Sequence, residues 1–310
     1  MRLALVLCGL VSLAVMVAAR EPQRPKITGV AHMALYVHDM DKARAYYKDF
    51  LGYGEPFDLK NADGSLAMTF IKINDRQYLE LFPEREAGTD RLNHIGVETD
   101  DVEAMRVYLK ARGVAVPDKV NKARVGNLSF TVKDPDGHGV EFVQYMPDGW
   151  MTRDKGKFLP AEAISTDMRH YGILVGGLDA ALGFYRDVLG FTETWRGSRD
   201  EKALSWVNLQ VPDGRDYLEF MLYQDLPEPT KRGSQHHICL FVPDVANALA
   251  TLQPRAAHIG YATAMEPRTG INRRRQLNLF DPDGTRTELM EPATIDGKPV
   301  PSSQAPPPRK

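Results

Sequence analysis

The sequence has few cysteines and no excess of basic residues. Cys8 lies in the N-terminal apolar run, so if that run is removed only Cys239 remains and no intrachain disulfide can form. Packing must then stabilise the fold. The formal net charge is −2 with both signs interspersed, which excludes the basic stripe that nucleic-acid binding requires. We expect a small-molecule partner and no nucleic acid, and the oligomeric state stays open.

An apolar run at the N-terminus, from Leu3 to Val17, follows Arg2 and leads to a small-residue site that ends at Ala19. This layout is typical of a signal peptide at 1–19. An uncleaved anchor is the alternative, but the run is shorter than the roughly 20 residues that span a bilayer. We therefore expect a secreted or periplasmic protein with no stable membrane span after cleavage.

The chain contains a long internal repeat. The segment Tyr46–Tyr53 recurs 138 residues later as Phe184–Phe191, and the tetrapeptide Asp-Pro-Asp-Gly occurs at 134–137 and at 281–284. In both copies of the tetrapeptide, a glutamate follows the glycine by four residues. The chain is therefore interpreted as a duplication.

The repeat divides the chain into successive segments. We predict a signal peptide at 1–19, a first domain at 26–148, a linker at 149–163, a second domain at 164–292 and a disordered tail at 293–310. The tail is predicted to be disordered because it is rich in Pro, Ser and Lys. With 310 residues, the chain is long enough to form two compact cores.

Each half is duplicated again. Four segments align without gaps, and each is predicted to be a short strand that starts at a histidine and leads into a helix: His32, His94, His170 and His237. Alternation along these strands places apolar side chains on one face and the histidines on the other. The residue two places after each histidine is small, which leaves space in front of the imidazole: Ala34, Gly96, Gly172 and Cys239. The predicted fold is α+β, with four βαβββ modules.

Each module also ends in a strand that carries one glutamate among apolar residues: Glu80, Glu141, Glu219 and Glu288. The separations from histidine to glutamate are 48, 47, 49 and 51 residues. A carboxylate among large apolar side chains is costly to bury unless it is paired, protonated or bound to a metal. A single histidine or glutamate on a strand is most often structural, but four of each in one register indicate metal ligands.

These features together resemble the vicinal-oxygen-chelate (VOC) superfamily. The resemblance rests on the histidine strands, the helix end with the pattern aromatic-Tyr-x-x-x-Leu-Gly, and the Asp-Pro-Asp-Gly hairpin before a glutamate, and it covers Val30 to Met290. The superfamily includes glyoxalase I, methylmalonyl-CoA epimerase, bleomycin- and fosfomycin-resistance proteins and extradiol dioxygenases. The resemblance implies two tandem glyoxalase-like domains, each a U-shaped mixed sheet of two modules around a cavity that holds one metal.

Carried over residue by residue, the resemblance implies two metal sites. The first quartet of ligands would be His32, Glu80, His94 and Glu141, and the second would be His170, Glu219, His237 and Glu288. Two imidazoles and two carboxylates suit Zn, Ni, Mn, Co or Fe(II), and the sequence does not choose among them. The full quartet most resembles glyoxalase I and the epimerases, which are lyases and isomerases that act on vicinal oxygens through a metal-bound enediolate. One glutamate of each site, Glu80 or Glu141 and Glu219 or Glu288, would then move the proton.

An extradiol-type Fe(II) dioxygenase is the first alternative function. His170, His237 and Glu288 match the two-histidine, one-carboxylate triad of those enzymes. The match then fails, because the segment 267–278 has neither the histidine nor the tyrosine that those enzymes carry before the last ligand.

A non-enzymatic small-molecule binding or resistance protein is the second alternative. It ranks behind both enzymes because such members generally lack the metal ligands, whereas this chain has all eight. Between the two sites, the sequence slightly favours the first half as the active one. Its junction from Glu80 to His94 spans only 14 residues, against 18 from Glu219 to His237.

Overall fold

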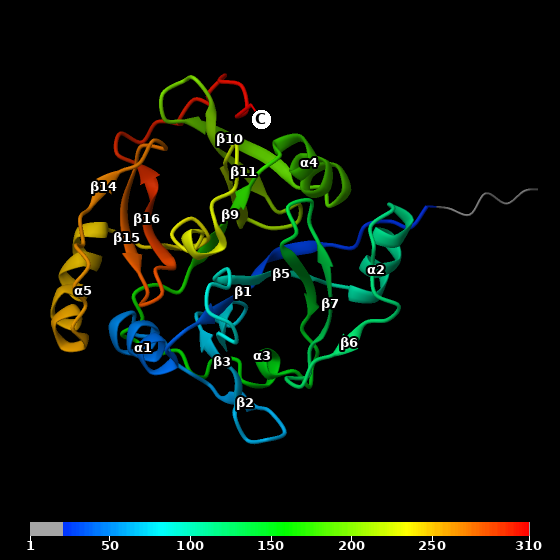
Figure 1. The fold of residues 1–310 in the computed structure, drawn as a ribbon, viewed down its shortest axis with the longest axis horizontal. Helices are drawn as coiled ribbons and strands as arrows, with labels where there is room; N and C mark the ends of the chain where they lie inside the picture. Colours follow the sequence, from blue (N-terminus) through cyan, green and yellow to red (C-terminus); the bar gives the residue numbers. More distant parts are fainter. Residues whose placement is uncertain (1–20, 310) are drawn as a thin grey trace, which may run out of the picture.

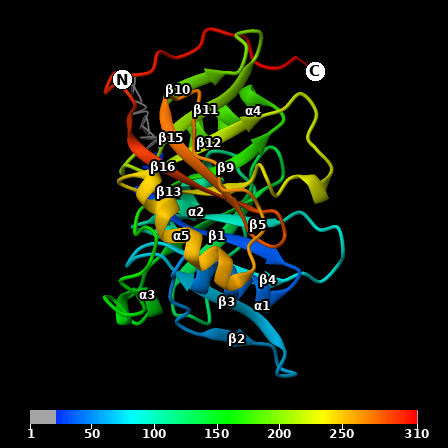
Figure 2. The ribbon, with the colours of Figure 1, turned by 90° about the vertical axis from the view of Figure 1, so that its left-hand side faces the viewer.

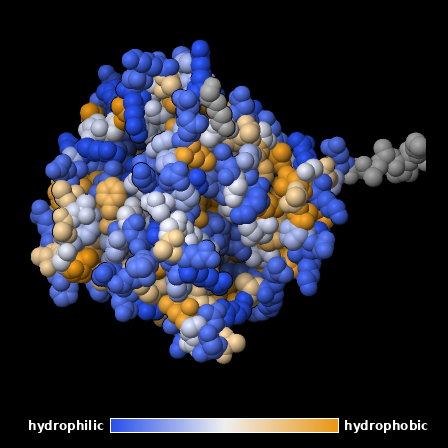
Figure 3. Space-filling view, in the orientation of Figure 1, coloured by the Kyte–Doolittle hydropathy of each residue, from blue (hydrophilic) through white to orange (hydrophobic). Residues whose placement is uncertain are grey.

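The structure is a computed structural model that describes residues 21–309. The signal peptide expected at 1–19 therefore lies outside the described residues. Within residues 21–309, no helix is long and apolar enough to cross a bilayer. The face of the molecule seen in Figure 3 is mostly hydrophilic, with its hydrophobic residues in small groups.

The first half forms one curled, mixed sheet from two consecutive modules (Figure 1). Its eight strands within residues 21–309, in spatial order, are β2 (Asp58–Lys60), β3 (Leu66–Lys72), β4 (Tyr78–Pro83), β1 (Ile27–Val37), β5 (Leu92–Thr99), β8 (Gly139–Gln144), β7 (Leu128–Lys133) and β6 (Asn121–Lys122). The central pair β1 and β5 is antiparallel, whereas β1 with β4 and β5 with β8 are parallel. The two modules therefore meet at the middle of the sheet, where their histidine strands lie side by side.

The second half repeats this topology. Its eight strands in the same described range, in spatial order, are β10 (Thr192–Ser198), β11 (Leu204–Gln210), β12 (Tyr217–Leu222), β9 (Met168–Val175), β13 (His237–Phe241), β16 (Arg286–Thr294), β15 (Arg274–Phe280) and β14 (Arg268–Thr269). The pairing of β9 with β12 and of β13 with β16 is again parallel, and that of β9 with β13 antiparallel. The predicted α+β fold of four βαβββ modules is confirmed.

The helices lie on the outer, apolar faces of the sheets. They are α1 (Met40–Arg44), which continues into the π-helix η1 (Ala45–Phe50), then α2 (Val102–Ala111), α4 (Leu178–Leu182) with the π-helix η2 (Gly183–Val188), and α5 (Val245–Ile259). A short 3-10 helix, η3 (Pro229–Lys231), precedes β13. Asp101 and Asp244 begin α2 and α5 as N-caps, because their side chains accept hydrogen bonds from backbone N–H groups of the first turn.

The two halves share one continuous hydrophobic core. Helix α5 of the second half lies beside α1 and η1 of the first half in both views (Figures 1 and 2), where Tyr261 stacks on Phe50 with 4.7 Å between ring centroids. Reciprocally, Tyr108 of α2 donates a hydrogen bond to the carbonyl of Val188 in η2. The helices of each half thus pack against those of the other.

The connection between the halves is more than a linker. It contains α3 (Trp150–Arg153), whose Trp150 is fully buried with Phe70 and Tyr78 in a second hydrophobic cluster of the first half. The N-terminal part of the segment predicted as a linker at 149–163 therefore belongs to the first domain structurally.

The C-terminal segment differs from its expectation. The sequence predicts disorder at 293–310, but β16 extends to Thr294 and the following residues lie along the edge of the second sheet. The backbone N–H of Ser303 donates to the carbonyl of Arg196 in β10, and that of Leu204 in β11 donates to the carbonyl of Pro306. Backbone groups at a sheet edge need partners, and the tail supplies them.

Candidate metal centres

Strand pairing brings the first histidine–glutamate quartet together on the concave face of the first sheet. The small residue Ala34 of β1 lies opposite both Glu80 of β4 and His94 of β5. Gly96 of β5 lies opposite the other two members of the quartet. Because opposite residues of paired strands point to the same face, all four polar side chains converge.

Three members of the first quartet are in close contact. His32 Nε2 lies 2.9 Å from His94 Nε2 and 2.9 Å from Glu141 Oε2, and His94 Nε2 lies 3.2 Å from the same carboxylate oxygen. Glu80 is more distant, with its Oε2 3.6 Å from His94 Nε2. Single ligand atoms of His32, His94 and Glu141 lie within 4.8 Å of one another, a spacing that one metal ion bridges with bonds of about 2.0–2.2 Å.

The second quartet has the same register, with Gly172 opposite both Glu219 and His237. All four candidate ligands are buried and offer ligand atoms within 4.8 Å of one another. His170 Nε2 lies 3.1 Å from His237 Nε2 and 3.5 Å from Glu288 Oε2, and His237 Nε2 lies 3.5 Å from Glu219 Oε2. This half therefore gathers its complete quartet around one point.

The space for the imidazoles depends on glycine. A Cβ atom at Gly96 would lie 2.3 Å from Cε1 of His32, and one at Gly172 would lie 1.8 Å from Cε1 of His237. Real side chains do not tolerate such contacts, so the histidine rings lie directly over backbone that has no side chain. Of the small residues noted in the sequence, Gly96 and Gly172 thus have a steric role, one in each half.

The first quartet is held together by its own charges. Burial lowers the pKa of His32, but the carboxylates of Glu80 and Glu141 outweigh it, and the net shift is upward. Burial opposes ionisation of Glu141, yet hydrogen bonds from His32 and His94 hold the pKa of Glu141 well below its usual range. Burial raises the pKa of Glu80. These shifts favour an ionised Glu141 beside a protonated His32, and a neutral Glu80.

The second quartet favours neutral imidazoles. Burial, followed by the cationic neighbour Arg286, lowers the pKa of His237 to about 3, and burial also lowers the pKa of His170. Burial raises the pKa of Glu288, although Arg286 and His237 oppose the shift. His237 Nδ1 lies 2.7 Å from the carbonyl of Gln235, so it can donate to that carbonyl and leave Nε2 free as a ligand. Neutral imidazole is the form that binds metals.

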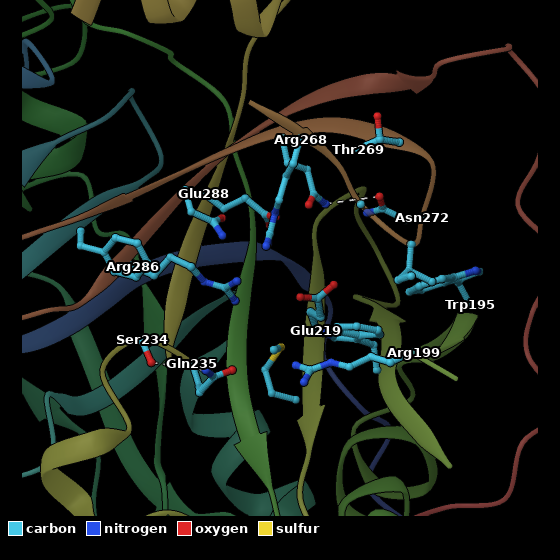
Figure 4. A pocket seen from close by; sticks show the side chains of 17 residues that line it. Trp195, Arg199, Glu219, Ser234, Gln235, Arg268, Thr269, Asn272, Arg286 and Glu288 are labelled. Atoms are coloured by element: carbon cyan, nitrogen blue, oxygen red, sulfur yellow. Dashed lines mark hydrogen bonds between the residues drawn. The ribbon is translucent and has the colours of Figure 1, made fainter. Parts of the chain in front are cut away.

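A cavity of about 650 Å³ opens at the second quartet (Figure 4). Glu219 and Glu288 face it directly, and Trp195 and Trp206 form part of its wall. Small-molecule sites usually have volumes of about 300–1,000 Å³. The two glutamates of the second quartet therefore line a space that a small substrate can enter, and the two histidines lie buried behind them.

In the first half, aromatic side chains occupy the concave side beside the quartet. The ring of Tyr78 stacks on His32 with 4.8 Å between centroids, and Trp150 of α3 packs on Tyr78 at 5.1 Å. Phe70 of β3 completes the contact with Trp150 at 5.4 Å. Tyr217 packs on His170 in the same way at 4.5 Å, so Trp150 and Phe70 are what distinguish the first half. They fill the space beside Tyr78, although His94 and Glu141 keep 14% and 18% of their side chains exposed, more than Glu219 and Glu288 at 10% and 5%.

Two asparagines of the second site were not found by the sequence analysis. Asn208 lies opposite Glu219 on β11, and Asn278 lies opposite Glu288 on β15. Both have a buried Oδ1 atom with no hydrogen-bond partner in the described part of the chain. At the corresponding positions the first half has Phe70 and Thr131. Buried polar atoms without partners are uncommon, so these amides indicate a site built for a ligand.

Arg286 was also missed. It lies opposite His237 on the neighbouring strand, where the first half has Gly139 opposite His94. Its Nη2 atom is 2.7 Å from His237 Nδ1. The signal was present in the sequence, because aligning the two Asp-Pro-Asp-Gly hairpins places an arginine against a glycine two residues before the last predicted ligand of each half.

The chain belongs to the Glyoxalase/Bleomycin resistance protein/Dioxygenase superfamily. The model of that family matches residues 29–142 and 167–289, one segment in each half. The match to two segments confirms the tandem arrangement inferred from the internal repeat.

Curated relatives of the chain are lactoylglutathione lyases at low identity. A probable lactoylglutathione lyase of Vibrio parahaemolyticus is 27% identical over 124 residues, which are 37% of this chain and 89% of that lyase. The lactoylglutathione lyase GLX1 of Arabidopsis thaliana is 24% identical over 204 residues, 64% of this chain and 66% of that lyase.

Solved structures with the same fold include a dioxygenase and a glyoxalase. An extradiol ring-cleaving dioxygenase from B. fuscum superimposes with a TM-score of 0.67 at 17% identity, over 92% of this chain and 77% of that one. The Mn(II)-bound glyoxalase from Novosphingobium aromaticivorans gives a TM-score of 0.65 at 18% identity, over 89% and 84%. At these identities the likeness concerns the fold alone.

Proposed function

We propose that this chain is a metal-dependent lyase or isomerase of the superfamily, and that its second half holds the working site. The observation that carries the proposal is the convergence of His170, Glu219, His237 and Glu288 around one point, with both glutamates lining an open cavity. Two imidazoles and two carboxylates fit Zn, Ni, Mn, Co or Fe(II). The proposed substrate is a small molecule with vicinal oxygens, as in the lactoylglutathione lyases that the chain resembles.

A divalent metal bound there would act as a Lewis acid on the substrate oxygens. The residues of the chain would do the rest. His170 and His237 would present Nε2, and the carbonyl of Gln235 would fix the tautomer of His237 through Nδ1. Glu219 or Glu288 would take a proton from the carbon beside the polarised carbonyl and return it, because both carboxylates face the cavity.

The choice of the second half reverses the slight preference drawn from the spacing of the sequence. The short junction between Glu80 and His94 carries no information about what fills the concave face. In the first half, Trp150 and Phe70 fill the space beside Tyr78, whereas in the second half the cavity reaches both glutamates.

The decisive experiment combines metal analysis with a reaction assay. Protein prepared without an affinity tag should contain at least about one divalent ion per chain after reconstitution with each candidate metal in turn. Lyase or isomerase chemistry predicts exchange of the hydrogen beside a carbonyl with solvent deuterium, which NMR detects in a panel of 2-hydroxycarbonyl compounds. A protein that binds less than about 0.2 equivalents of every metal would exclude the enzyme proposal.

A matched assay separates the dioxygenase alternative. Glu219 gives the second site a fourth candidate ligand, whereas the dioxygenase triad would use only His170, His237 and Glu288. We therefore expect no oxygen uptake by the Fe(II)-loaded protein with catechols. Uptake with ring cleavage would replace the lyase or isomerase assignment. Export remains a proposal from the sequence at 1–19, and N-terminal sequencing of the mature protein should show cleavage after Ala19.

A further inference from the structure

Three arginines converge on the cavity of the second half from three different elements (Figure 4). Arg199 follows β10, Arg268 lies in β14 and Arg286 lies in β16, beside the candidate ligand His237. The only acidic side chains in the cavity lining are Glu219 and Glu288, as far as the described residues show. Those two belong to the proposed metal site. A divalent ion bound there would neutralise both carboxylates, which would then not balance the charge of the arginines.

The arginines have no carboxylate in direct contact, although Arg286 and Arg268 lie close enough to Glu288 to interact with its charge. Among residues 21–309, none of the three forms an ion pair with a carboxylate. Arg286 is only 8% exposed, and its Nε atom is buried without a hydrogen-bond partner in the described chain. A buried guanidinium that lacks an acidic partner is costly, and a ligand that supplies the missing acceptor relieves the cost.

The first half lacks this positive set. The aligned strands and hairpins place Asn61, Asn121 and Gly139 at the positions of Arg199, Arg268 and Arg286. The shared fold therefore does not require basic residues there. Their presence in the half with the open cavity is a property of that cavity.

We propose that the second cavity binds an anionic small molecule whose oxyanion, a carboxylate or a phosphate, lies against Arg199, Arg268 and Arg286. This inference rests on the proposed function, because it names the substrate class of the same site. Guanidinium groups pair with both oxyanions through parallel hydrogen bonds. His237 Nδ1 cannot donate a hydrogen bond to the carbonyl of Gln235 and accept one from Arg286 at the same time. A bound oxyanion would accept the hydrogen bond of Arg286 instead and leave Nδ1 free to donate to Gln235.

The walls of the cavity add a preference for a flat group next to the oxyanion. Trp195 and Trp206 line it, and the guanidinium carbon of Arg199 lies 5.2 Å from the centre of the Trp206 ring. Stacked tryptophan and arginine offer planar surfaces to an unsaturated or aromatic ligand. The same tryptophans give a signal for binding, because the sequence contains only three and the third, Trp150, is buried in the first half.

The test uses three probes that share a phenyl ring and differ in the attached group: benzoate, phenyl phosphate and neutral benzyl alcohol. Binding is followed by tryptophan fluorescence and calorimetry in the metal-loaded protein and after chelation. We expect at least one anion to bind about tenfold or more tightly than benzyl alcohol, the scale of one charge-assisted hydrogen bond. Tighter benzoate binding identifies a carboxylate ligand, and tighter phenyl phosphate binding identifies a phosphate ligand. Equal binding of all three probes overturns the proposal.

Variants assign the effect to the arginines. Arg268→Gln and Arg199→Gln change exposed side chains and should each weaken anion binding about tenfold without changing metal content. Arg286→Gln should weaken it further, and Arg286→Lys should restore part of the loss. Arg186→Gln, which removes an exposed pair with Asp187, is the control and should bind as wild type does.

The two proposals fail separately. If no metal binds but the preference for anions persists after chelation, the enzyme proposal is wrong and the oxyanion site stands. If metal binds normally and the three glutamine variants bind benzoate and phenyl phosphate as wild type does, the oxyanion site is wrong and the metal site stands.

Discussion

The two halves of this protein have one topology and the same four candidate ligands, two histidines and two glutamates each, yet they have become different sites. In the first half, the linker helix α3 inserts Trp150 among aromatic residues beside His32. In the second half, no such helix follows the quartet up to residue 309, where the described chain ends, and asparagine, arginine and tryptophan line an open cavity. A complete set of ligand types therefore does not decide which copy of a duplicated site works; the side chains around it do.

The comparison also shows how duplication stabilises the molecule. Tyr47 of the first half donates a hydrogen bond to Asp281 of the second, and Tyr185 of the second donates to Asp134 of the first. These reciprocal bonds join each helix to the Asp-Pro-Asp-Gly hairpin of the other half. Both bonds are buried and cross between the halves, so the first half contributes packing and hydrogen bonds to the second whatever its own activity.

The largest expected effect separates the two quartets. His237→Ala should reduce metal affinity at the second site by at least about 100-fold and abolish turnover, because the loss of even an outer partner of a ligand costs about 10–100-fold. His94→Ala should remove a ligand only from the first quartet and leave turnover within about threefold of wild type. Bound metal and deuterium exchange are measured in both variants. Loss of activity only in His94→Ala would show that the first half is the working one.

The second effect concerns Trp150. Trp150→Ala should lower the free energy of unfolding by about 3–5 kcal/mol, because a fully buried large aromatic side chain leaves a cavity. Trp206→Ala, in the partly exposed wall of the second cavity, should cost less than half of that. Urea unfolding of both variants gives the two values. A small loss for Trp150→Ala would mean that α3 does not hold the first half together.

Much of this architecture could be predicted from the sequence, because repeats and alternation are local signals. The register of His32 with His94 and of both with their glutamates follows from strand alternation and the spacing of the motifs. The packing of Trp150 on the first half could not be predicted. A connecting segment has no hydrophobic periodicity, so the sequence does not indicate which surface its side chains contact. Arg286 aligns with Gly139 in the other hairpin. A repeat is recognised from the positions that agree, so a position that differs gives no signal of repetition.

A third, smaller effect concerns the first aspartate of each Asp-Pro-Asp-Gly hairpin, Asp134 and Asp281. Their contributions to the free energy of unfolding should depend on pH with opposite signs. Burial raises the pKa of Asp281 to about 7, so its contribution to stability is present below the pKa of the unfolded chain and is lost as the pH rises through about 7. Burial also opposes ionisation of Asp134, but bonds to His138 outweigh it and lower the pKa of Asp134. Its contribution is present above the unfolded pKa and is lost as the pH falls through the lowered value.

Substitution of each aspartate by asparagine tests this contrast. Relative to Asp281→Asn, the wild type should lose stability between pH 4 and pH 7, by an amount on the order of a few kcal/mol. Relative to Asp134→Asn, the wild type should gain stability as the pH rises from 2 to 5 and then stay constant. Thermal unfolding of the three proteins at matched ionic strength gives the curves. Parallel curves for the two variants would contradict the opposite shifts.

The smallest expected effect comes from the tail, which only the second sheet has along its edge. Deleting residues 298–310 removes the acceptor for Leu204 N–H and the hydroxyl of Ser302, which accepts a bond from Arg196 N–H. Each exposed bond contributes about 0.5–1.5 kcal/mol, so global stability should change little, while hydrogen exchange at Arg196 and Leu204 becomes faster. Amides of β2 and β3, at the corresponding edge of the first sheet, serve as the internal control. Faster exchange at both edges would mean that the tail stabilises the whole molecule, and unchanged exchange at Leu204 would mean that the tail does not pair with the sheet in solution.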